Sequence, residues 1–298
     1  MAKLLIIDGN NLAYRSYYAN SKLSYKMKDT GLIYGFFNQL ISISKNYPDH
    51  FKIICWDGGY DRRLKESTEA VKLGIVPETY KENRRTREKT EDDESIKIQM
   101  AELKVGLDHV KAMQVRVQGY EGDDLCFTYA KQNQLEGGDS VVISSDKDYY
   151  QLIDDKIILL DTMKCIEWTK PKFINDFGFA PERWVDVGAL EGESSQTGDN
   201  IFAVPGWGPK TSQDYIKQYG TVENVIQAVQ SKSKKSKKEE TLLQYLPRIA
   251  LAKSLKSMDM VPLAPKPKLT KSYSANELRA YFLTVGFHSL MSNADKLV

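Results

Sequence analysis

The chain has 298 residues, of which 41% are hydrophobic and 28% are charged, a balance that excludes a disordered or fibrous protein. The 42 basic and 40 acidic side chains leave a net charge of +2, which says little about partners. Three widely spaced cysteines argue against disulfides and against a zinc site. The apolar start is too short for a signal peptide and no stretch is long enough to cross a membrane, so we expect a cytoplasmic protein.

Buried strands are predicted where continuous apolar runs end in a turn. Such runs are Lys3–Asp8, Lys52–Asp57, Val115–Gln118 and Ser140–Ser145. Apolar residues at three- and four-residue intervals predict helices between them, over Tyr34–Ser44, Ile96–Met113 and Asp124–Gln134. Strands that alternate with helices predict an α/β fold, in which helices cover a parallel sheet on both faces.

Acidic residues stand where these strands end. Asp8, Asp57 and Asp146 directly follow apolar strands, and Glu121 follows the third strand after a short turn. Each acid alone is more readily explained as a helix cap or a turn former. Ligands in open α/β sheets bind beyond the carboxyl ends of the strands, however, so the set as a whole predicts one common site.

The carboxylates available to that site are numerous, and their number indicates bound cations. Neighbouring carboxylates raise one another's pKa unless positive charge neutralises them. Two Mg²⁺ ions about 3.5–4 Å apart would supply that charge and would activate water for phosphodiester hydrolysis. The candidate acids are Asp8, Asp57, Glu121, Asp123, Asp124, Asp146, Asp148, Glu193 and Asp199.

The second part of the chain has a different character. Residues 78–102 are rich in both charge signs and should be exposed, and the chain beyond Phe177 becomes helical and rich in turns. We place a boundary near Phe179, which gives a domain of residues 1–178 and a helical lobe of residues 179–298. The lysine-rich run at 231–238 predicts a solvated basic loop.

Six motifs, in this order, resemble those of the 5′ nuclease superfamily, which includes flap endonucleases, the 5′→3′ exonuclease domain of bacterial DNA polymerase I and stand-alone phage enzymes. The tail around Glu277 to Phe287 resembles the end of the polymerase-linked domain, and because no polymerase follows it the phage type is favoured. The resemblance implies a PIN-like parallel sheet, a helical arch over about residues 78–104, and a helix-hairpin-helix (H3TH) motif in the lobe. The motifs are Ile7–Asn11, Trp56–Gly58, Tyr80–Arg84, Glu121–Asp124, Ser145–Leu152 and Gly198–Thr211.

The resemblance also implies metal ligands. Asp8, Asp57, Glu121, Asp123 and Asp124 would hold or orient the first ion, and Asp146, Asp148, Glu193 and Asp199 would form the second site. Mg²⁺ is the expected ion, Mn²⁺ is expected to substitute for it, and K⁺ is a further ion that the helix-hairpin-helix would bind. The run Gly192–Ile201 departs from the Gly-Asp-x-x-Asp-Asn-Ile pattern by an insertion and by Glu193.

Residues that bind DNA follow from the same resemblance. Lys81 and Arg84 would face the scissile phosphate at the base of the arch, and Tyr80 would stack on a base. In the turn, Gly206 and Gly208 let the backbone approach a DNA phosphate, and the next helix begins at Lys210 and Thr211. The alternatives are a solvated helix face for the first group and an ordinary tight turn for the second.

The function implied is a metal-dependent 5′ nuclease acting on flaps, branched or nicked duplexes and single-stranded 5′ ends, with RNA–DNA hybrids as a further substrate. Lys81, Arg84 and Asp146 would be catalytic, in a monomer in a bacterial or phage-infected cytoplasm. Three alternatives stay open: a PIN-type ribonuclease, a DNA-junction-binding protein with a weakened second metal site, and a haloacid-dehalogenase-like phosphatase. The long region after Phe179 argues against the ribonuclease, and Tyr150 argues against the phosphatase.

Overall fold

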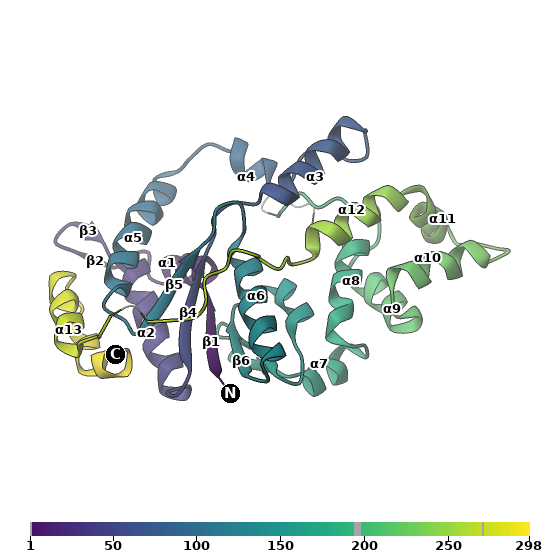
Figure 1. Ribbon diagram of the computed structural model, residues 1–298. Helices are drawn as coiled ribbons and strands as arrows, with labels where there is room; N and C mark the ends of the chain where they lie inside the picture. Colours follow the sequence, from purple (N-terminus) through teal and green to yellow (C-terminus); the bar gives the residue numbers. More distant parts are fainter. Residues whose placement is uncertain (1, 194–197, 270) are drawn as a thin grey trace.

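The computed structural model describes residues 2–193, 198–269 and 271–298. A six-stranded sheet with the order β5-β4-β1-β6-β7-β8 forms its centre, and only the pairing of β8 with β7 is antiparallel (Figure 1). The predicted parallel α/β sheet is confirmed, with two strands more than the sequence indicated. The strands are β1 Lys3–Asp8, β4 Phe51–Trp56, β5 Ala112–Arg116, β6 Asp139–Ile143, β7 Ile157–Asp161 and β8 Ile166–Trp168.

Side chains of the central strands alternate between two cores. Leu5 and Ile7 of β1 pack on one face, whereas Leu4 and Ile6 pack on the other, as the two-residue period of a strand requires. The first face is covered by α1 Gly9–Ala19, α2 Gly31–Asn46, α5 Glu91–Leu107 and α13 Ala275–Thr284. The second face is covered by α6 Gly122–Leu135, η1 Lys147–Leu152 and α7 Lys170–Phe177.

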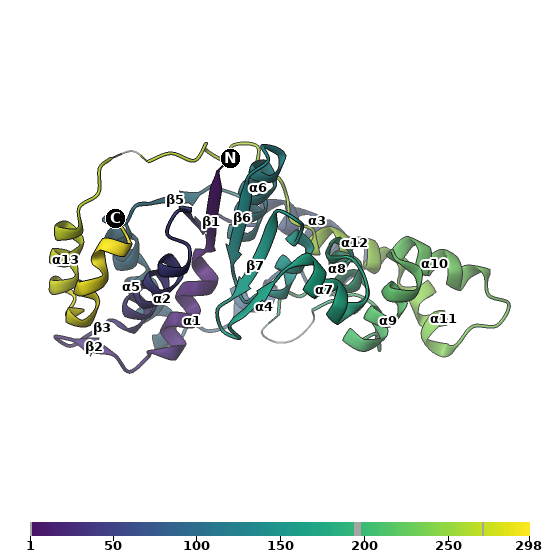
Figure 2. The same ribbon diagram turned by 90° about the horizontal axis from the view of Figure 1, so that it is seen from below.

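A helical lobe extends from the second face (Figure 2). It contains η2 Pro181–Arg183, α8 Trp184–Glu191, α9 Pro209–Tyr219, α10 Val222–Ser231, α11 Lys237–Gln244 and α12 Leu246–Lys256. Its apolar residues, such as Trp207, Ile216 and Val225, belong to the same core as the second face of the sheet. Lobe and sheet therefore share one continuous core.

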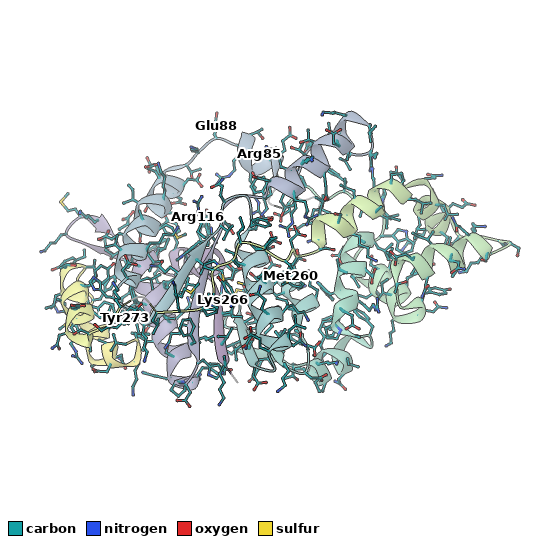
Figure 3. All side chains as sticks on the ribbon, in the orientation of Figure 1. Arg85, Glu88, Arg116, Met260, Lys266 and Tyr273 are labelled. Atoms are coloured by element: carbon teal, nitrogen blue, oxygen red, sulfur yellow. The ribbon has the colours of Figure 1, made fainter. Side chains whose placement is uncertain are left out.

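The C-terminal segment leaves this lobe. It runs past Met260, Lys266 and Tyr273, which Figure 3 labels, and crosses to the opposite end of the molecule. There α13 and η3 His288–Lys296 pack on the first face of the sheet, beside α2. The structure thus divides the predicted lobe of residues 179–298, because the apolar faces of the last two helices are buried against the α/β domain.

Two predicted boundaries need correction. The helix predicted over 96–113 begins earlier, at Glu91, and ends at Leu107, while the strand predicted from Val115 already begins at Ala112. Met113 therefore lies on β5, where it pairs with Ile53 of β4. A buried helix end and a buried strand both present apolar runs, so periodicity alone could not separate them.

The charged segment that follows α3 Asp61–Lys72 arches over the carboxyl end of the sheet (Figure 1). Its one helix, α4 Glu82–Thr86, has five residues, and Arg85 and Glu88 lie at the outer edge of the arch in Figure 3. The predicted arch extended to residue 104. Most of α5 instead packs in the core, with Leu103 fully buried, so the free part of the arch ends before α5.

A short hairpin, β2 Ser24–Tyr25 and β3 Lys28–Asp29, connects α1 to α2 and was not predicted. Its turn residues Lys26 and Met27 have positive φ angles of 49° and 63°. In the part of the chain that the structure describes, no helix combines the length and the apolar character needed to cross a membrane.

Candidate active site

Parallel pairing brings the predicted acids to one edge of the sheet. Asp8 is the last residue of β1 and is also the N-cap of α1, since its carboxylate accepts a hydrogen bond of 3.0 Å from the Asn11 backbone N–H. Its other oxygen accepts from the hydroxyls of Ser144 and Tyr149, at 3.2 and 3.0 Å. Asp8 is thus both the N-cap of α1 and a residue of the candidate site. Burial, opposed by the Asn11 hydrogen bond and assisted by the charge of Asp57, raises the pKa of Asp8 to about 6.

Asp57 follows β4 and is exposed. The backbone N–H of Gly122 donates to its carboxylate at 2.8 Å, and its own N–H donates to the side chain of Asn10 at 3.1 Å. Asp57 is therefore tied to the starts of both α6 and α1. These contacts hold three strand-end segments in a fixed arrangement.

Arg63, which the sequence did not indicate, organises the acids at the start of α6. Its guanidinium donates to Glu121 at 2.8 Å and binds Asp124 in a bidentate manner at 2.8 and 2.9 Å. The arginine is only 3% exposed, and its remaining hydrogens reach the carbonyl oxygens of Leu255 and Ser257. It therefore joins the α/β domain to the end of α12.

Asp124 differs from the other predicted ligands because it does not line the cavity beneath the arch. Besides Arg63, its carboxylate accepts hydrogen bonds from the backbone N–H groups of Glu121 and Asp259, at 3.2 and 2.8 Å. With 1% exposure and both oxygens engaged, Asp124 has a supporting position behind the cavity. This position fits the second of the two roles that the resemblance implies for Asp124, that of orienting the ligands of the first ion.

Glu121 and Asp123 do line the cavity. Burial raises the pKa of Glu121 above its ordinary value, although the positive charges of Lys81 and Arg63 oppose that rise. Burial also raises the pKa of Asp123. The negative charges of Glu121 and Asp124 raise it further, whereas the positive charge of Arg63 opposes the rise. Ionising all of these acids together requires more positive charge than these protein groups supply.

The base of the arch contributes Lys81, which is the N-cap of α4 and has a left-handed backbone with φ 53°. Its ammonium forms an ion pair with Glu121 and lies 3.6 Å from the carboxylate of Asp199. Burial by itself would lower the pKa of Lys81, but the charges of Glu121 and Asp199 outweigh burial and raise it. Arg84, predicted beside Lys81, also forms an ion pair with Asp199, at 2.6 Å.

The stacking role predicted for Tyr80 does not fit its position. Tyr80 is 3% exposed, and its hydroxyl donates to Glu121 at 3.1 Å and to Asp199 at 3.0 Å. Its ring packs edge-on against Tyr60, with centroids 5.5 Å apart. No base can reach the ring, so Tyr80 instead holds two acids of the site together.

The second group of acids is built around Lys256 at the end of α12. Its ammonium lies 2.9 Å from Asp148 and 2.8 Å from Glu193, and its side chain is 9% exposed. Backbone hydrogen bonds of 2.6 and 3.0 Å between Glu193 and Ile201 close the base of the intervening loop. The predicted insertion in that loop falls on residues 194–197, which lie outside the described residues.

Asp146 caps η1, where its carboxylate accepts from the backbone N–H of Asp148 at 2.9 Å. Burial, with the charge of Asp148 added to it, raises the pKa of Asp146 to about 7. The nearby Lys256 opposes this rise, but the shift shows that its single charge does not neutralise the group.

These residues surround a cavity of about 400 Å³ under the arch. Five cations face eight carboxylates there, so three negative charges are in excess when all groups are ionised. Among the described residues, no three acids are already arranged around a single point as ligands of one ion. The cations are Arg15, Arg63, Lys81, Arg84 and Lys256, and the acids are Asp8, Asp57, Glu121, Asp123, Asp146, Asp148, Glu193 and Asp199.

Aromatic residues of α1 also line the cavity, and the sequence analysis missed them. Tyr14 is 43% exposed and Tyr18 is 65% exposed, in contrast to the buried Tyr80. Their spacing from Asn11, at three and seven residues, is that of one helix face, which is a signal the sequence did contain. Lys256 and Arg63 carried no comparable signal.

The predicted DNA-binding turn precedes α9. Trp207 is 2% exposed and donates from its indole to the Lys238 carbonyl at 3.1 Å, which anchors the turn. Gly206 has φ 78°, and a side-chain carbon at Gly206 or Gly208 would meet no protein atom within 4 Å. The backbone here is open to a large ligand.

The start of α11 lies beside this turn. The Lys238 ammonium donates to the Thr211 hydroxyl at 3.1 Å, so part of the predicted lysine loop is helical and placed next to α9. Ser236 and Glu239 form the capping box that begins this helix. Lys210 in the first turn of α9 is exposed, and Gly208 is the N-cap of that helix.

The sequence matches two domains of one family. Residues 3–178 match the 5′-3′ exonuclease N-terminal resolvase-like domain, and residues 179–274 match the 5′-3′ exonuclease C-terminal SAM fold. The chain belongs to the 5′-3′ exonuclease family. This confirms the resemblance to the 5′ nucleases and, with it, a family of phosphodiester hydrolases.

Known relatives of this 5′-3′ exonuclease family include stand-alone and polymerase-linked proteins. The 5′-3′ exonuclease of Aquifex aeolicus (strain VF5) is 29% identical over all of this chain and 96% of its own length. DNA polymerase I of Bacillus subtilis (strain 168) is 29% identical over 97% of this chain. The chain spans about a third of that polymerase, 32% of its length.

Solved structures show the same fold. The T5 5′-exonuclease with bound zinc has a TM-score of 0.70 and 21% identity, covering 99% of this chain and 97% of its own. The catalytic core of Rad2 in complex with DNA substrate has a TM-score of 0.59 and 16% identity, covering 100% and 92%. The predicted sheet with a helical C-terminal domain is thus the fold of these nucleases.

Proposed function

We propose that this member of the 5′-3′ exonuclease family is a divalent-metal-dependent nuclease that cuts phosphodiesters near the 5′ end of flapped or branched DNA. The observation that carries the proposal is the cavity of eight carboxylates directly beneath the arch, bordered by Lys81 and Arg84. The relatives support it, because T5 structures are described with metal ions and with DNA, and Rad2 with a DNA substrate.

The donor chemistry of the cavity fits divalent ions. All its candidate ligands are oxygen atoms, which hard cations such as Mg²⁺ prefer. Burial raises the pKa of Asp8 and Asp146, and neighbouring carboxylates add to the rise, so a bound cation would favour their ionised forms. Two Mg²⁺ ions, for which Mn²⁺ would substitute, would supply an activated water and neutralise charge on the attacked phosphate. We assign Asp8, Asp57, Glu121 and Asp123 to one ion, and Asp146, Asp148, Glu193 and Asp199 to the other.

Lys81 and Arg84 are proposed to hold the scissile phosphate. Their present partners, Glu121 and Asp199, are among the proposed metal ligands. When a cation engages those carboxylates, the ammonium and guanidinium would turn to phosphate oxygens, as compact and bidentate donors respectively. Lys81 and Arg84 would thus bind the DNA phosphate only when metal ions are bound to the carboxylates.

DNA contacts outside the cavity follow from exposure. Tyr14 and Tyr18 offer accessible rings on which a base near the 5′ end can stack, which is the role that burial denies to Tyr80. Gly206 and Gly208 leave backbone amides open to a duplex phosphate, with Lys210 and Thr211 at the following helix start. Such contacts fix the position of the DNA without reading its base sequence. A K⁺ ion bound at this turn is also part of the proposal.

The decisive experiment uses a 5′-labelled flap substrate with and without Mg²⁺, in DNA and RNA versions. We expect metal-dependent release of short labelled products from DNA flaps, and the RNA arm measures how far hybrids are accepted. Cleavage of RNA alone would indicate the PIN-type ribonuclease, and release of inorganic phosphate without chain cleavage would indicate the phosphatase. Flap binding with no cleavage in any metal would overturn the proposal in favour of a junction-binding protein.

The position of Lys256 favours unequal affinities for the two proposed metal ions. Lys256 places its ammonium between Asp148 and Glu193, where the second ion would need to bind. A divalent ion must displace or share space with that charge, so we propose that the second site is the weaker one. Two transitions in a titration of metal binding, of which the weaker is sensitive to Lys256, would support this, whereas one transition insensitive to Lys256 would contradict it.

A further inference from the structure

A second cavity lies where β4 begins, and its wall includes Val298 at the C-terminal end of the chain. Figure 1 shows that the start of β4 is at the opposite end of the sheet from the arch. The cavity has a volume of about 910 Å³. Its wall combines the end of α2, the start of β4, the turn before β5 and η3, and none of its residues lines the nuclease cavity. The residues that matter here are Ser44, Lys45, His50, Lys52, Lys111 and Lys296.

Polar groups deep in this cavity have unsatisfied hydrogen-bonding capacity. The Ser44 hydroxyl is buried, with the residue 2% exposed, and has no hydrogen-bond partner among the described residues. His50 is half-buried, and its Nδ1 atom is likewise buried without a described partner. Buried polar atoms are almost always paired, since an unpaired one has lost its hydrogen bonds to water without replacement. Two such atoms in the wall of one cavity therefore indicate a ligand that completes them.

Lys52 adds a buried charge to these groups. Its residue is 6% exposed, and within the described residues no carboxylate lies within ion-pair distance of its ammonium. Burial, and then the positive charge of Lys111, lowers the pKa of Lys52. Burial and the charge of Lys3 likewise lower the pKa of His50. Asp49 and Asp139 oppose the lowering at His50 but do not cancel it.

Exposed lysines surround the buried one. Lys45, Lys111 and Lys296 line the same cavity, and none of the ion pairs between described residues involves them. Of the two acids in the wall, Asp49 is exposed and Asp295 is already paired with Arg279. The four lysines of the cavity wall therefore outnumber its two acidic side chains, of which one is already paired.

We infer that this cavity is a binding site for a phosphate monoester or inorganic phosphate, held by Lys52 and Ser44 and by the surrounding Lys45, Lys111 and Lys296. A phosphate dianion supplies several acceptor oxygens and a double negative charge, which matches clustered donors better than a single carboxylate does. The inference does not depend on the proposed nuclease function, because the two cavities share no residue.

Two sources of this chemistry are compatible with the cavity. Inorganic phosphate would use only the donors at the base, whereas a 5′-mononucleotide would also fill the remaining volume, which lies in the range of small-molecule sites. A 5′-mononucleotide is also the class of product that a 5′→3′ exonuclease releases. Comparing both ligands on one protein separates these sources.

The test is calorimetric titration of the full chain with inorganic phosphate and, separately, with thymidine 5′-monophosphate, in a metal-free buffer containing EDTA. The variants are Lys52→Met, Ser44→Ala and Lys111→Gln, and Lys65→Met on α3 is the matched control outside the cavity. Lys52→Met replaces the lysine with an unbranched side chain one atom shorter and removes an unpaired charge, so we expect it to fold. Thermal melting of each variant checks this.

We expect saturable one-to-one binding that weakens by at least about tenfold in Lys52→Met and Ser44→Ala, as the loss of a charge-assisted hydrogen bond predicts, with Lys65→Met unchanged. Tighter binding of the nucleotide would identify it as the source, and equal binding would identify the phosphate group alone. No heat of binding with either ligand, or equal binding by the parent and folded Lys52→Met, would overturn the inference.

Discussion

Arg63 and Lys256 both neutralise carboxylates of the active-site cavity, but they do so in different ways. Arg63 is 3% exposed and donates to two acids and to the carbonyl oxygens of Leu255 and Ser257, so each of its nitrogens is fixed. Among the described residues, the Lys256 ammonium donates to carboxylates alone, those of Asp148 and Glu193. The Arg63 guanidinium is held in place by the fold, whereas the Lys256 ammonium is one that a metal ion could replace beside the carboxylates.

The comparison shows how one protein can treat two acidic groups differently. A planar guanidinium with fixed donors is built into the structure, and removing it leaves buried charges unpaired. A lysine ammonium at the end of a flexible stem can leave when a stronger cation arrives. Gly188 of α8 provides room for that stem, since a side-chain carbon there would lie 3.1 Å from Lys256 Cγ.

The largest expected effect concerns the acids of the proposed second metal site, beside Lys256. In Asp146→Asn a carboxylate of the proposed second metal site becomes neutral, so we expect the single-turnover rate of flap cleavage to fall by about a thousandfold or more. Flap binding in Ca²⁺ should persist, because the DNA contacts are elsewhere. Asp155→Asn, at an exposed acid outside the cavity, is the control, and parent-like cleavage by Asp146→Asn would remove this residue from the metal site.

Removing the fixed cation should affect folding before chemistry. Arg63→Met leaves Glu121 and Asp124 buried without their partner, and we expect the free energy of unfolding to fall by about 3–5 kcal/mol in urea denaturation. Arg183→Met removes a 39% exposed arginine near Asp186 and should cost less than about 1 kcal/mol. An equal decrease in the free energy of unfolding in both variants would show that the Arg63 contacts stabilise the protein no more than those of an exposed arginine.

Lys81→Ala should slow the chemical step by about a hundredfold, because a buried cation beside the scissile phosphate stabilises charge that develops in the transition state. Affinity for the flap should change little. Arg85→Ala, at an exposed arch position, should keep the parent single-turnover rate at saturating DNA. A parent-like rate in Lys81→Ala would exclude the arch base from catalysis.

Lys256→Met tests whether its ammonium competes with the second ion. Without it, the carboxylates of Asp148 and Glu193 should bind a divalent ion more tightly by about tenfold, which calorimetric titration with Ca²⁺ would measure. Lys253→Met is the matched control, because it lies on the same helix and pairs with Asp186 and Glu223 instead. Weaker binding in Lys256→Met would mean that the ammonium supports the site.

The smallest expected effect is a change in metal stabilisation with pH. In metal-free protein the raised pKa values of Asp8 and Asp146, about 6 and about 7, mean that the folded state binds protons more tightly than the unfolded state. These two acids therefore lower stability as pH rises from about 4 to about 7. A divalent ion requires both to be ionised, so Mg²⁺ should raise the melting temperature more at about pH 8 than at about pH 5. An equal rise would separate these groups from the metal.

The phosphodiester chemistry was accessible from the sequence because strand periodicity and turn position are local properties. Apolar runs that end in Asp8, Asp57 and Asp146 predicted that these acids lie at one edge of a parallel sheet, and they line one cavity. Their identity as acids and the regular spacing of strands and helices were enough for this inference. The family motifs added the arch base and the open turn around Gly206.

Other features were decided only by tertiary packing. Burial turned Tyr80 from a candidate stacking residue into a hydrogen-bond donor, and it placed Asp124 behind the cavity with Arg63. The association of α13 with α2 also has no local signal, since an apolar helix face does not specify its partner. Contacts between residues far apart in the chain, such as Arg63 with Leu255 or Lys256 with Asp148, depend on the whole fold, and the compensation of charge in the site depends on them.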